Sequence, residues 1–359
     1  MDIVTSLCVD DSRHPASYYD QLQDVNADQR RRVYWQCVTV FFATSTRCNP
    51  TAGHVLYTND KAHTTWHGTD CREFLRGLGV QIRELEFEQY QPPANFSGKF
   101  RNGFYKLEVM RELASPQAAD CSLLLDSDCV WTRSSPELEA AVGSGSLLLY
   151  DISPGPDDKI FGLSRRDMGD LYRQLFPQFP AEAPQYYGGE LVGGTRARFG
   201  ELIATIDQQW HHIVSTYTQQ PPRFCNQESL FDGDEYVTIM AYNSLPRPKL
   251  DAQPFIRRMW TAYRYSDVRD SDLALPIWHM PSEKLQGIPV LTRLVLNPRS
   301  SFWRVPQAEL GHYLGRYLGV PHSLLNPQRL LSLASKLPTA WRLAKRMLTP
   351  KKNLVLTPS

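Results

Sequence analysis

The amino-acid sequence predicts an α/β fold with a largely parallel sheet. Apolar runs typical of buried strands alternate at short spacing with stretches of helical periodicity, the pattern of parallel sheets flanked by helices. The 26 prolines indicate many loops between short elements. With 359 residues, of which 42% are apolar and 21% charged, the chain can bury a sizeable core and is not predicted to be disordered.

The elements are assigned in chain order from residue type and periodicity. After a polar lead-in, residues 33–42 are interpreted as a buried strand, because β-branched and aromatic types dominate them. Next come a strand at 54–57, a helix at 70–78, a strand at 80–87, a helix at 98–114 and a strand at 121–126. We then expect a helix at 165–175, a strand at 187–194, a helix at 196–217 and a helix followed by a strand within 224–245. Residues 246–322 are rich in proline and receive no assignment.

Charge divides the chain into two parts. Residues 1–309 hold 31 cations and 38 acids, a net charge of −7, whereas residues 310–359 carry eight cations and no acid. We therefore expect one domain at 1–322 and a basic tail at 323–359.

The tail contains an amphipathic stretch at 339–348. It places Trp341 and other apolar side chains on one helical face and Arg342, Lys345 and Arg346 on the opposite one. This pattern is typical of a helix at an anionic membrane surface, where each cation contributes roughly 1 kcal/mol. Docking of the helix on the acidic domain is the alternative. A single basic segment without a recognised binding motif does not predict nucleic-acid binding.

The compartment is expected to be the cytoplasm, with the protein peripheral at the membrane. The first residues lack a basic region followed by an apolar stretch, and no run approaches 18 apolar residues. The seven cysteines are scattered and form no Cys-x-x-Cys pair, which favours reduced thiols over a disulfide framework or a zinc cluster.

The strongest chemical signal is a pair of carboxylates after an apolar strand. Asp126 and Asp128 follow the strand at 121–126, and on an extended chain their spacing puts both side chains on one face. Ligands of open α/β sheets bind outside the carboxyl ends of the strands. Two converging carboxylates repel unless a cation joins them, and a hard divalent ion prefers oxygen ligands. The alternative is that Asp-Ser-Asp only opens a turn or caps a helix at Pro136.

This strand and its Asp-x-Asp motif resemble those of the GT-A glycosyltransferases, over roughly residues 33–295. The resemblance implies a GT-A fold, in which a Rossmann-like, mostly parallel sheet is flanked by helices. It also implies a nucleotide-diphosphate sugar donor, most often a UDP-sugar, and Mn²⁺ or Mg²⁺ held by Asp126 and Asp128, with Asp126 also at the donor. Related enzymes often place a basic residue in the helix before this strand, where Arg101 and Lys106 stand. A solvated position on the helix surface is the alternative for Lys106.

Residues 186–195, YYGGELVGGT, resemble the tyrosine-then-Gly-Gly-Thr segment of the retaining blood-group and α-galactosyl transferases. By that match Gly193 and Gly194 belong to the donor site, since glycine lets a backbone approach a sugar ring closely. A bulge or a tight turn is the alternative.

The segment Glu228-Ser229-Leu230 resembles the Glu-Ser-x-Leu segment of the same families, with Cys-Asn-Gln before it where they have Trp-His-Asp. The resemblance implies that Glu228 faces the reacting sugar as nucleophile or as stabiliser of the transition state. An acid at a helix N-terminus beside Asn226 is the alternative. If the reaction inverts and needs a general base, the candidates are Asp232, Asp234 and Glu235, of which we single out Asp234.

The segment from His279 to Lys284 resembles the late His-to-Lys segment of glycogenin-like retaining transferases. In those enzymes the histidine is a third metal ligand and the lysine binds diphosphate. Imidazole suits a borderline ion such as Mn²⁺, and an ammonium group can neutralise phosphate. A structural histidine is the alternative.

Together these features predict a glycosyltransferase that moves a sugar, with retention, to a glycan or lipid-linked acceptor, as in polysaccharide biosynthesis. Two alternatives remain. One is a nucleotidyltransferase of related fold, although no glycine-rich phosphate loop with a lysine lies near the N-terminus. The other is a catalytically inactive sugar-binding protein.

Overall fold

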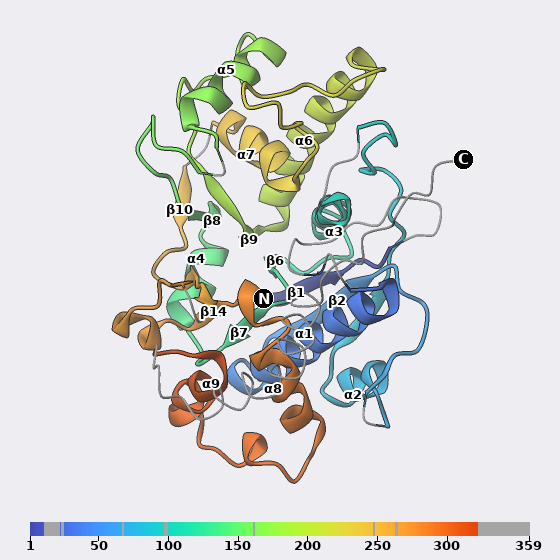
Figure 1. Ribbon diagram of the computed structural model, residues 1–359, viewed down its shortest axis with the longest axis vertical. Helices are drawn as coiled ribbons and strands as arrows, with labels where there is room; N and C mark the ends of the chain where they lie inside the picture. The colour runs from blue at the N-terminus through green and yellow to red at the C-terminus, as the bar shows by residue number, and fades with distance from the viewer. Residues whose placement is uncertain are drawn as a thin grey trace, which may run out of the picture.

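The computed structural model describes residues 1–10, 22, 25–66, 68–96, 100–160, 162–246, 248–262 and 265–321. Its centre is a seven-stranded sheet in the order β10-β8-β9-β6-β1-β2-β5 (Figure 1). Only β9 runs antiparallel to its neighbours in this sheet, so the prediction of an α/β fold with a largely parallel sheet is confirmed. The strands are β1 (Asp2–Leu7), β2 (Gly53–Thr58), β5 (Gln81–Glu84), β6 (Cys121–Leu125), β8 (Leu147–Asp151), β9 (Tyr187–Thr195) and β10 (Lys249–Asp251).

After β6 the chain enters a second, smaller sheet. It has three strands, β11 (Ile256–Arg258), β14 (Ile277–His279) and β7 (Cys129–Trp131), with β14 in the middle. Two short hairpins complete the strands of the described residues, β3 (Thr65–Trp66) with β4 (Thr69–Asp70) and β12 (Thr261–Ala262) with β13 (Tyr265–Ser266).

Helices cover both faces of the main sheet (Figure 1). One apolar cluster contains side chains of α1 (Ala27–Cys48), α2 (Cys71–Gly77), α4 (Pro136–Gly143), α8 (Gly287–Leu296) and α9 (Leu310–Leu318). The other contains side chains of α3 (Tyr105–Leu113), α5 (Arg165–Leu175), α6 (Arg196–Thr216) and α7 (Asp234–Ser244). Successive residues of β6 alternate between the clusters, with Leu123 and Leu125 in the first and Leu124 in the second. A strand buried on both faces must be apolar throughout, which explains the run before Asp126.

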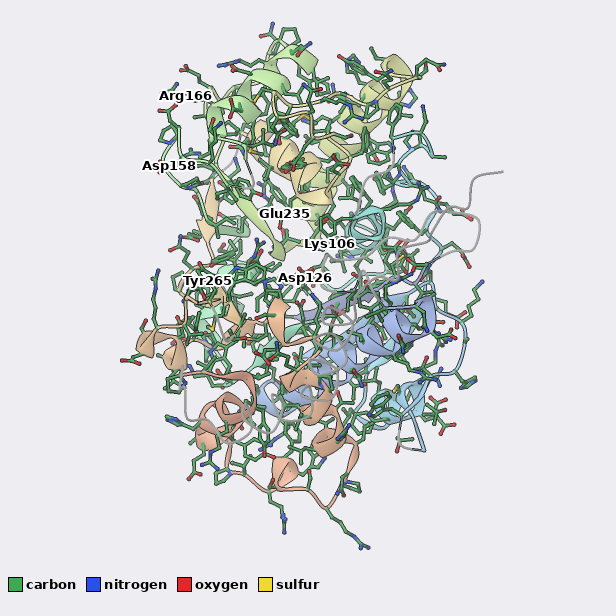
Figure 2. The ribbon with its side chains drawn as sticks, viewed as in Figure 1. Lys106, Asp126, Asp158, Arg166, Glu235 and Tyr265 are labelled. Atoms are coloured by element: carbon green, nitrogen blue, oxygen red, sulfur yellow. The ribbon has the colours of Figure 1, made fainter. Side chains whose placement is uncertain are left out.

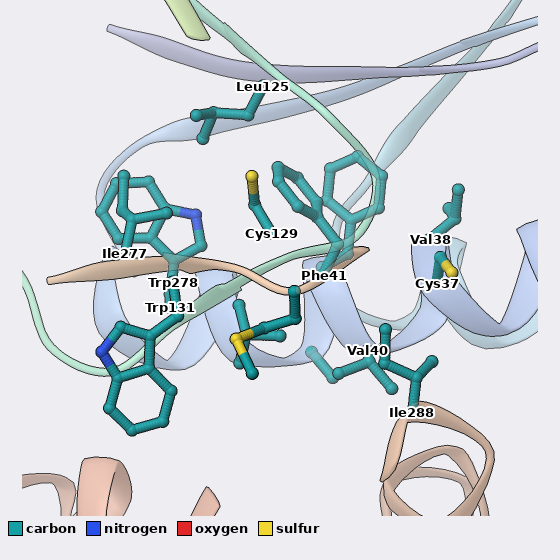
Figure 3. Packing of buried hydrophobic residues seen from close by; sticks show 14 of the residues in the cluster. Cys37, Val38, Val40, Phe41, Leu125, Cys129, Trp131, Ile277, Trp278 and Ile288 are labelled. Carbon is teal, nitrogen blue, oxygen red and sulfur yellow. The ribbon is translucent and has the colours of Figure 1, made fainter. Parts of the chain in front are cut away.

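Residues 33–42 are helical, so the prediction of a strand there is wrong. They lie inside α1, where Asn26 caps the N-terminus by accepting a hydrogen bond from the Gln29 backbone N–H at 2.9 Å. The helix packs against β7 and β1 on one side and against α8 and α2 elsewhere. Figure 3 shows Phe41 and Val38 of this helix in one cluster with Trp278 of β14. Burial on nearly all sides fills the segment with apolar residues, and a short apolar run does not separate a buried helix from a buried strand.

Two other assignments need correction. The polar lead-in contains β1, which lies between β2 and β6 near the centre of the sheet. Within 224–245 the helix is present as α7, but no strand follows it there, because β10 begins only at Lys249. The helix predicted at 98–114 is a 3₁₀ turn at Arg101–Phe104 followed by α3, which begins at Tyr105. The remaining assigned strands and helices are confirmed, with ends shifted by a few residues.

The basic tail at 323–359, with its amphipathic stretch, lies outside the described residues. Within the described part of the chain, none of the helices is both long and apolar enough to cross a membrane. All seven cysteines are free thiols.

Candidate metal centre

The candidate metal centre lies at the carboxyl end of β6. Asp126 follows the strand directly, and its carbonyl oxygen accepts a hydrogen bond from the Cys129 backbone N–H at 3.0 Å. Residues 126–129 therefore form a tight turn rather than the extended chain expected from the sequence. The turn nevertheless brings the side chains of Asp126 and Asp128 together, as predicted.

Pairing of β7 with β14 adds the third group. His279 lies opposite Cys129 in this antiparallel pair, and the Met280 backbone N–H donates to the Asp128 carbonyl oxygen at 3.1 Å. The imidazole Nε2 lies 3.3 Å from Oδ2 of Asp128 and 3.7 Å from Oδ2 of Asp126. One possible ligand atom from each of these three residues lies within 4.8 Å of the others. The predicted metal ligands therefore converge.

Two lysines flank the three groups. Lys284 Nζ contacts Oδ2 of Asp128 at 2.6 Å, and both side chains are buried. Lys106, on α3, contacts Oδ1 of Asp126 at 2.7 Å and donates to the carbonyl oxygen of Gly189 at 2.5 Å. Lys106 is thus part of the site rather than a solvated lysine (Figure 2).

The first turn of α7 supplies further acids. Asp234 lies 3.7 Å from Lys106 Nζ, so the predicted Asp234 also reaches the site. Its neighbour Glu235 accepts hydrogen bonds from the Gly189 backbone N–H at 3.0 Å and from the Tyr186 hydroxyl at 3.2 Å. Burial raises the pKa of Asp234, with Lys106 opposing the shift and Glu235 adding to it.

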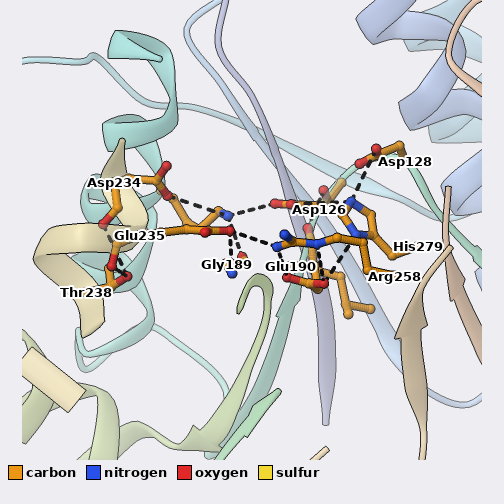
Figure 4. A network of polar contacts seen from close by, with 12 residues as sticks. Asp126, Asp128, Gly189, Glu190, Asp234, Glu235, Thr238, Arg258 and His279 are labelled. Carbon is orange, nitrogen blue, oxygen red and sulfur yellow. Dashed lines mark hydrogen bonds and ion pairs between the residues drawn. The ribbon is translucent and has the colours of Figure 1, made fainter. Parts of the chain in front are cut away.

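Glu190 and Arg258 complete the network, and the sequence analysis missed both (Figure 4). Glu190, in β9, is fully buried and receives two hydrogen bonds from the Arg258 guanidinium, at 2.9 and 2.6 Å. Arg258 also donates to Glu235 at 2.8 Å. A carboxylate in the middle of the apolar, glycine-rich strand at 187–194 was the available signal for Glu190. Arg258 carried no comparable signal.

The other predicted site residues are placed elsewhere. Arg101 is buried in a 3₁₀ turn, Arg101–Phe104, and donates to Oε1 of Gln91 at 3.0 Å. Glu228 accepts a hydrogen bond from the Tyr236 hydroxyl at 2.7 Å and lies in a loop before α7 rather than at the start of a helix.

Gly193 and Gly194 lie inside the sheet, opposite Leu123 and Ser122 of β6. A Cβ on Gly193 would come within 3.0 Å of Val142 on α4, so close helix packing accounts for that glycine. Gly189 contacts the site through its backbone, since its carbonyl oxygen accepts from Lys106 and its N–H donates to Glu235.

The side chains of this network carry more negative than positive charge, which favours the binding of a divalent cation. The carboxylates are Asp126, Asp128, Glu190, Asp234 and Glu235, and the permanent cations are Lys106, Arg258 and Lys284. With His279 neutral, the five acids exceed the three cations by two charges. Burial alone would lower the pKa of His279, but Asp128 and Glu190 raise it to about 9. The carboxylates around His279 therefore favour a positive charge at this end of the network.

The donor set also suits a metal ion. Two carboxylates and an imidazole are a ligand combination that Mn²⁺ accepts, and Mg²⁺ accepts the carboxylates. The second ring nitrogen of His279, Nδ1, lies 3.4 Å from Oε1 of Glu190. Metal-binding histidines commonly turn their other nitrogen to a carboxylate in this way.

Comparisons with known proteins give little sequence support. No protein-family model matches the chain, and no curated protein sequence matches it. Among solved structures, the crystal structure of galactosyltransferase LgtC in complex with donor and acceptor sugar analogues is similar to the chain. The match covers 92% of this chain and 99% of LgtC, with 14% identity and a TM-score of 0.44. The function of this chain is inferred from its own residues.

Proposed function

We propose that the chain is a metal-dependent glycosyltransferase of the GT-A type that takes a sugar from a nucleotide-diphosphate donor, specifically a UDP-sugar. The observation that supports this most is the convergence of Asp126, Asp128 and His279 between two lysines at the carboxyl end of β6. A cluster of this composition suits a divalent ion and a diphosphate together.

Bound Mn²⁺ or Mg²⁺ would neutralise the charge that develops on the leaving diphosphate. The residues of the chain have separate tasks. Asp126, Asp128 and His279 hold the ion, and Lys284 provides a positive charge for the phosphates from the Asp128 side. Lys106 fixes Asp126 and Asp234 relative to each other, because its ammonium group contacts both.

The acids of α7 are the candidates for the chemistry at the sugar. Figure 4 shows Asp234 and Glu235 at the end of the network opposite His279. Lys106 contacts both Asp234 and Asp126. A carboxylate there would stabilise an oxocarbenium-like transition state, or would attack the anomeric carbon and displace the nucleotide diphosphate. In the second case the acceptor hydroxyl then displaces the carboxylate, so two inversions leave the anomeric configuration of the donor unchanged. Glu228 remains a candidate from the sequence resemblance.

We also propose that the acceptor is a glycan or a lipid-linked sugar and that residues 323–359 hold the enzyme at an anionic membrane surface in the cytoplasm. The support is the sequence alone, namely the eight cations after Glu309 and the amphipathic stretch at 339–348.

A panel of nucleotide-sugars tests the central proposal. Thermal shift with and without Mn²⁺ should identify a donor that raises the melting temperature only with the metal, since a ligand selective for the folded state stabilises it. The same donor should release its nucleotide diphosphate with acceptor present, and EDTA should stop the release. Full turnover in excess EDTA would rule out the metal centre. Donor binding without release would favour the sugar-binding protein, and pyrophosphate exchange would favour the nucleotidyltransferase.

A further inference from the structure

The imidazole of His279 is held between acids on both of its edges. Its side chain is only 7% exposed, with Nε2 facing Asp128 and Asp126 and Nδ1 facing Glu190. Oε1 of Glu190 lies 3.4 Å from Nδ1, and Nδ1 has no hydrogen-bond partner among the described residues. Glu190 is therefore placed to accept the Nδ1–H after a small movement of either side chain.

Glu190 is linked to the metal turn through its backbone as well. Its carbonyl oxygen accepts a hydrogen bond from the Asp126 backbone N–H at 3.0 Å. One residue of β9 thus contacts the turn through its main chain and the histidine through its side chain.

The space for the Glu190 carboxylate is provided by a glycine. A Cβ on Gly188, two residues earlier and on the same face of β9, would collide with Oε2 of Glu190. Arg258 then fixes the carboxylate by two parallel hydrogen bonds, the geometry that guanidinium and carboxylate groups favour. The arrangement leaves Glu190 little freedom to turn away from His279.

Arg258 connects this support to helix α7. The same guanidinium group that binds Glu190 also binds Glu235, and Glu235 accepts the Gly189 N–H. A chain of direct contacts therefore runs from His279 through Glu190 and Arg258 to the acids that face the proposed donor sugar (Figure 4).

We propose that Glu190 and Arg258 are positioning residues of the metal centre. With a metal bound, Glu190 would accept the Nδ1–H of His279, which would leave the lone pair of Nε2 available to the ion. Arg258 holds Glu190 in place and ties it to Glu235. This inference rests on the part of the proposed function that assigns a metal ion to the site. It does not depend on the transfer of a sugar.

A second ion pair in the same small sheet serves as a matched control. Arg257, the neighbour of Arg258 on β11, binds Asp272 by two hydrogen bonds at 2.9 and 3.0 Å, and Asp272 is 2% exposed. This pair has the same geometry and comparable burial. No interaction between it and His279 is present among the described residues.

The test measures Mn²⁺ affinity of the full chain without nucleotide, by titration with electron paramagnetic resonance detection of free Mn²⁺. Glu190→Gln should weaken binding about 10- to 100-fold, the usual effect of removing such a supporting group. Asp272→Asn should leave the affinity unchanged although both variants lose a buried carboxylate. Equal affinity of Glu190→Gln and the wild type, or equal losses in both variants, would overturn the positioning role.

Gly188→Ala provides a variant with unchanged charge. The added methyl group would collide with Oε2 of Glu190 and lie 3.1 Å from Cδ1 of Tyr150, so the Glu190 carboxylate must move. The atoms nearest to the methyl group all belong to side chains, so the protein should fold while its Mn²⁺ affinity falls by at least about tenfold. If Glu190→Gln does not fold, the Mn²⁺ affinity of Gly188→Ala tests the proposal instead. An affinity equal to that of the wild type would then overturn it.

The outcomes separate this inference from the proposed function. A wild type that binds Mn²⁺ but transfers no sugar would leave the positioning role standing and reject the glycosyltransferase. A wild type that binds no Mn²⁺ would overturn both.

Discussion

Asp128 has a structural task in addition to its proposed metal binding. Burial alone would raise its pKa, but Lys284 and His279 hold the pKa of this carboxyl well below its usual range. The side chains of Asp128 and Lys284 are 3% and 5% exposed. A charge left unpaired in such a place is costly, so loss of metal binding and loss of stability must be measured separately.

Asp128→Asn should destabilise the metal-free protein by about 3–5 kcal/mol, because Lys284 then remains buried without its partner. The double variant Asp128→Asn/Lys284→Met should recover most of that loss, since an apolar side chain of similar volume replaces the ammonium group. Urea denaturation in EDTA measures both. Neither variant should bind Mn²⁺. Wild-type stability of the single variant would show that the ion pair contributes little.

Asp234 and Glu228 make different contacts, so substitutions at the two positions should have different effects on kcat. Asp234→Asn should lower kcat by about 100-fold or more, because Asp234 lies beside the Lys106 and Asp126 pair at the site. Glu228→Gln should lower kcat only a few-fold, since its carboxylate accepts the Tyr236 hydroxyl. Steady-state kinetics with the donor found by the panel compares them. The reverse order would return the catalytic role to Glu228, and an inverted anomer by product NMR would exclude retention.

At the scale of elements, α9 illustrates why a glycine is needed at one position and not at another. The helix has glycines at 311 and 315, one turn apart. A Cβ on Gly315 would collide with the carbonyl oxygen of Val320, which belongs to the backbone just after the helix. A Cβ on Gly311 would lie 3.5 Å from Cβ of Thr132, an ordinary contact.

Gly315→Ala should therefore destabilise the protein by about 1–3 kcal/mol through overpacking. Gly311→Ala should stabilise it by up to about 1 kcal/mol, because alanine is the better helix former. Urea denaturation midpoints of the two variants provide the comparison. Equal stability of both would mean that the backbone after α9 can move away at little cost.

At the scale of the whole molecule, the residues proposed for catalysis and the cations proposed for membrane binding lie in different parts of the sequence. The proposed chemistry lies between Asp126 and Lys284, whereas the eight cations without acids lie after Glu309. The two functions should therefore be separable by truncation.

Removal of residues 323–359 should abolish binding to anionic liposomes and leave donor hydrolysis largely unchanged. Binding of the full chain should weaken as salt rises, because screening reduces the attraction between exposed charges. Liposome sedimentation at two ionic strengths measures this. A truncated protein that aggregates would favour the helix docked on the domain, and one that still sediments with liposomes would place the membrane contact on another surface.

The sequence by itself determined the local features of this protein. The apolar run before Asp126 predicted a strand, and the spacing of Asp126 and Asp128 predicted that their carboxylates converge. Both follow from interactions within a few residues. The resemblance of the His279 segment added the third ligand, whose place beside the two aspartates agrees with the structure.

Only the tertiary structure decided the features that depend on contacts between distant segments. Residues 33–42 have strand-like side chains, yet they form α1 because packing against β7, β1 and α8 outweighs local propensity. Likewise, Glu190 and Arg258 meet His279 only because β9, β11 and β14 assemble around the end of β6. A buried charge is stable only beside its partner, and the partner here lies 68 residues away in the chain.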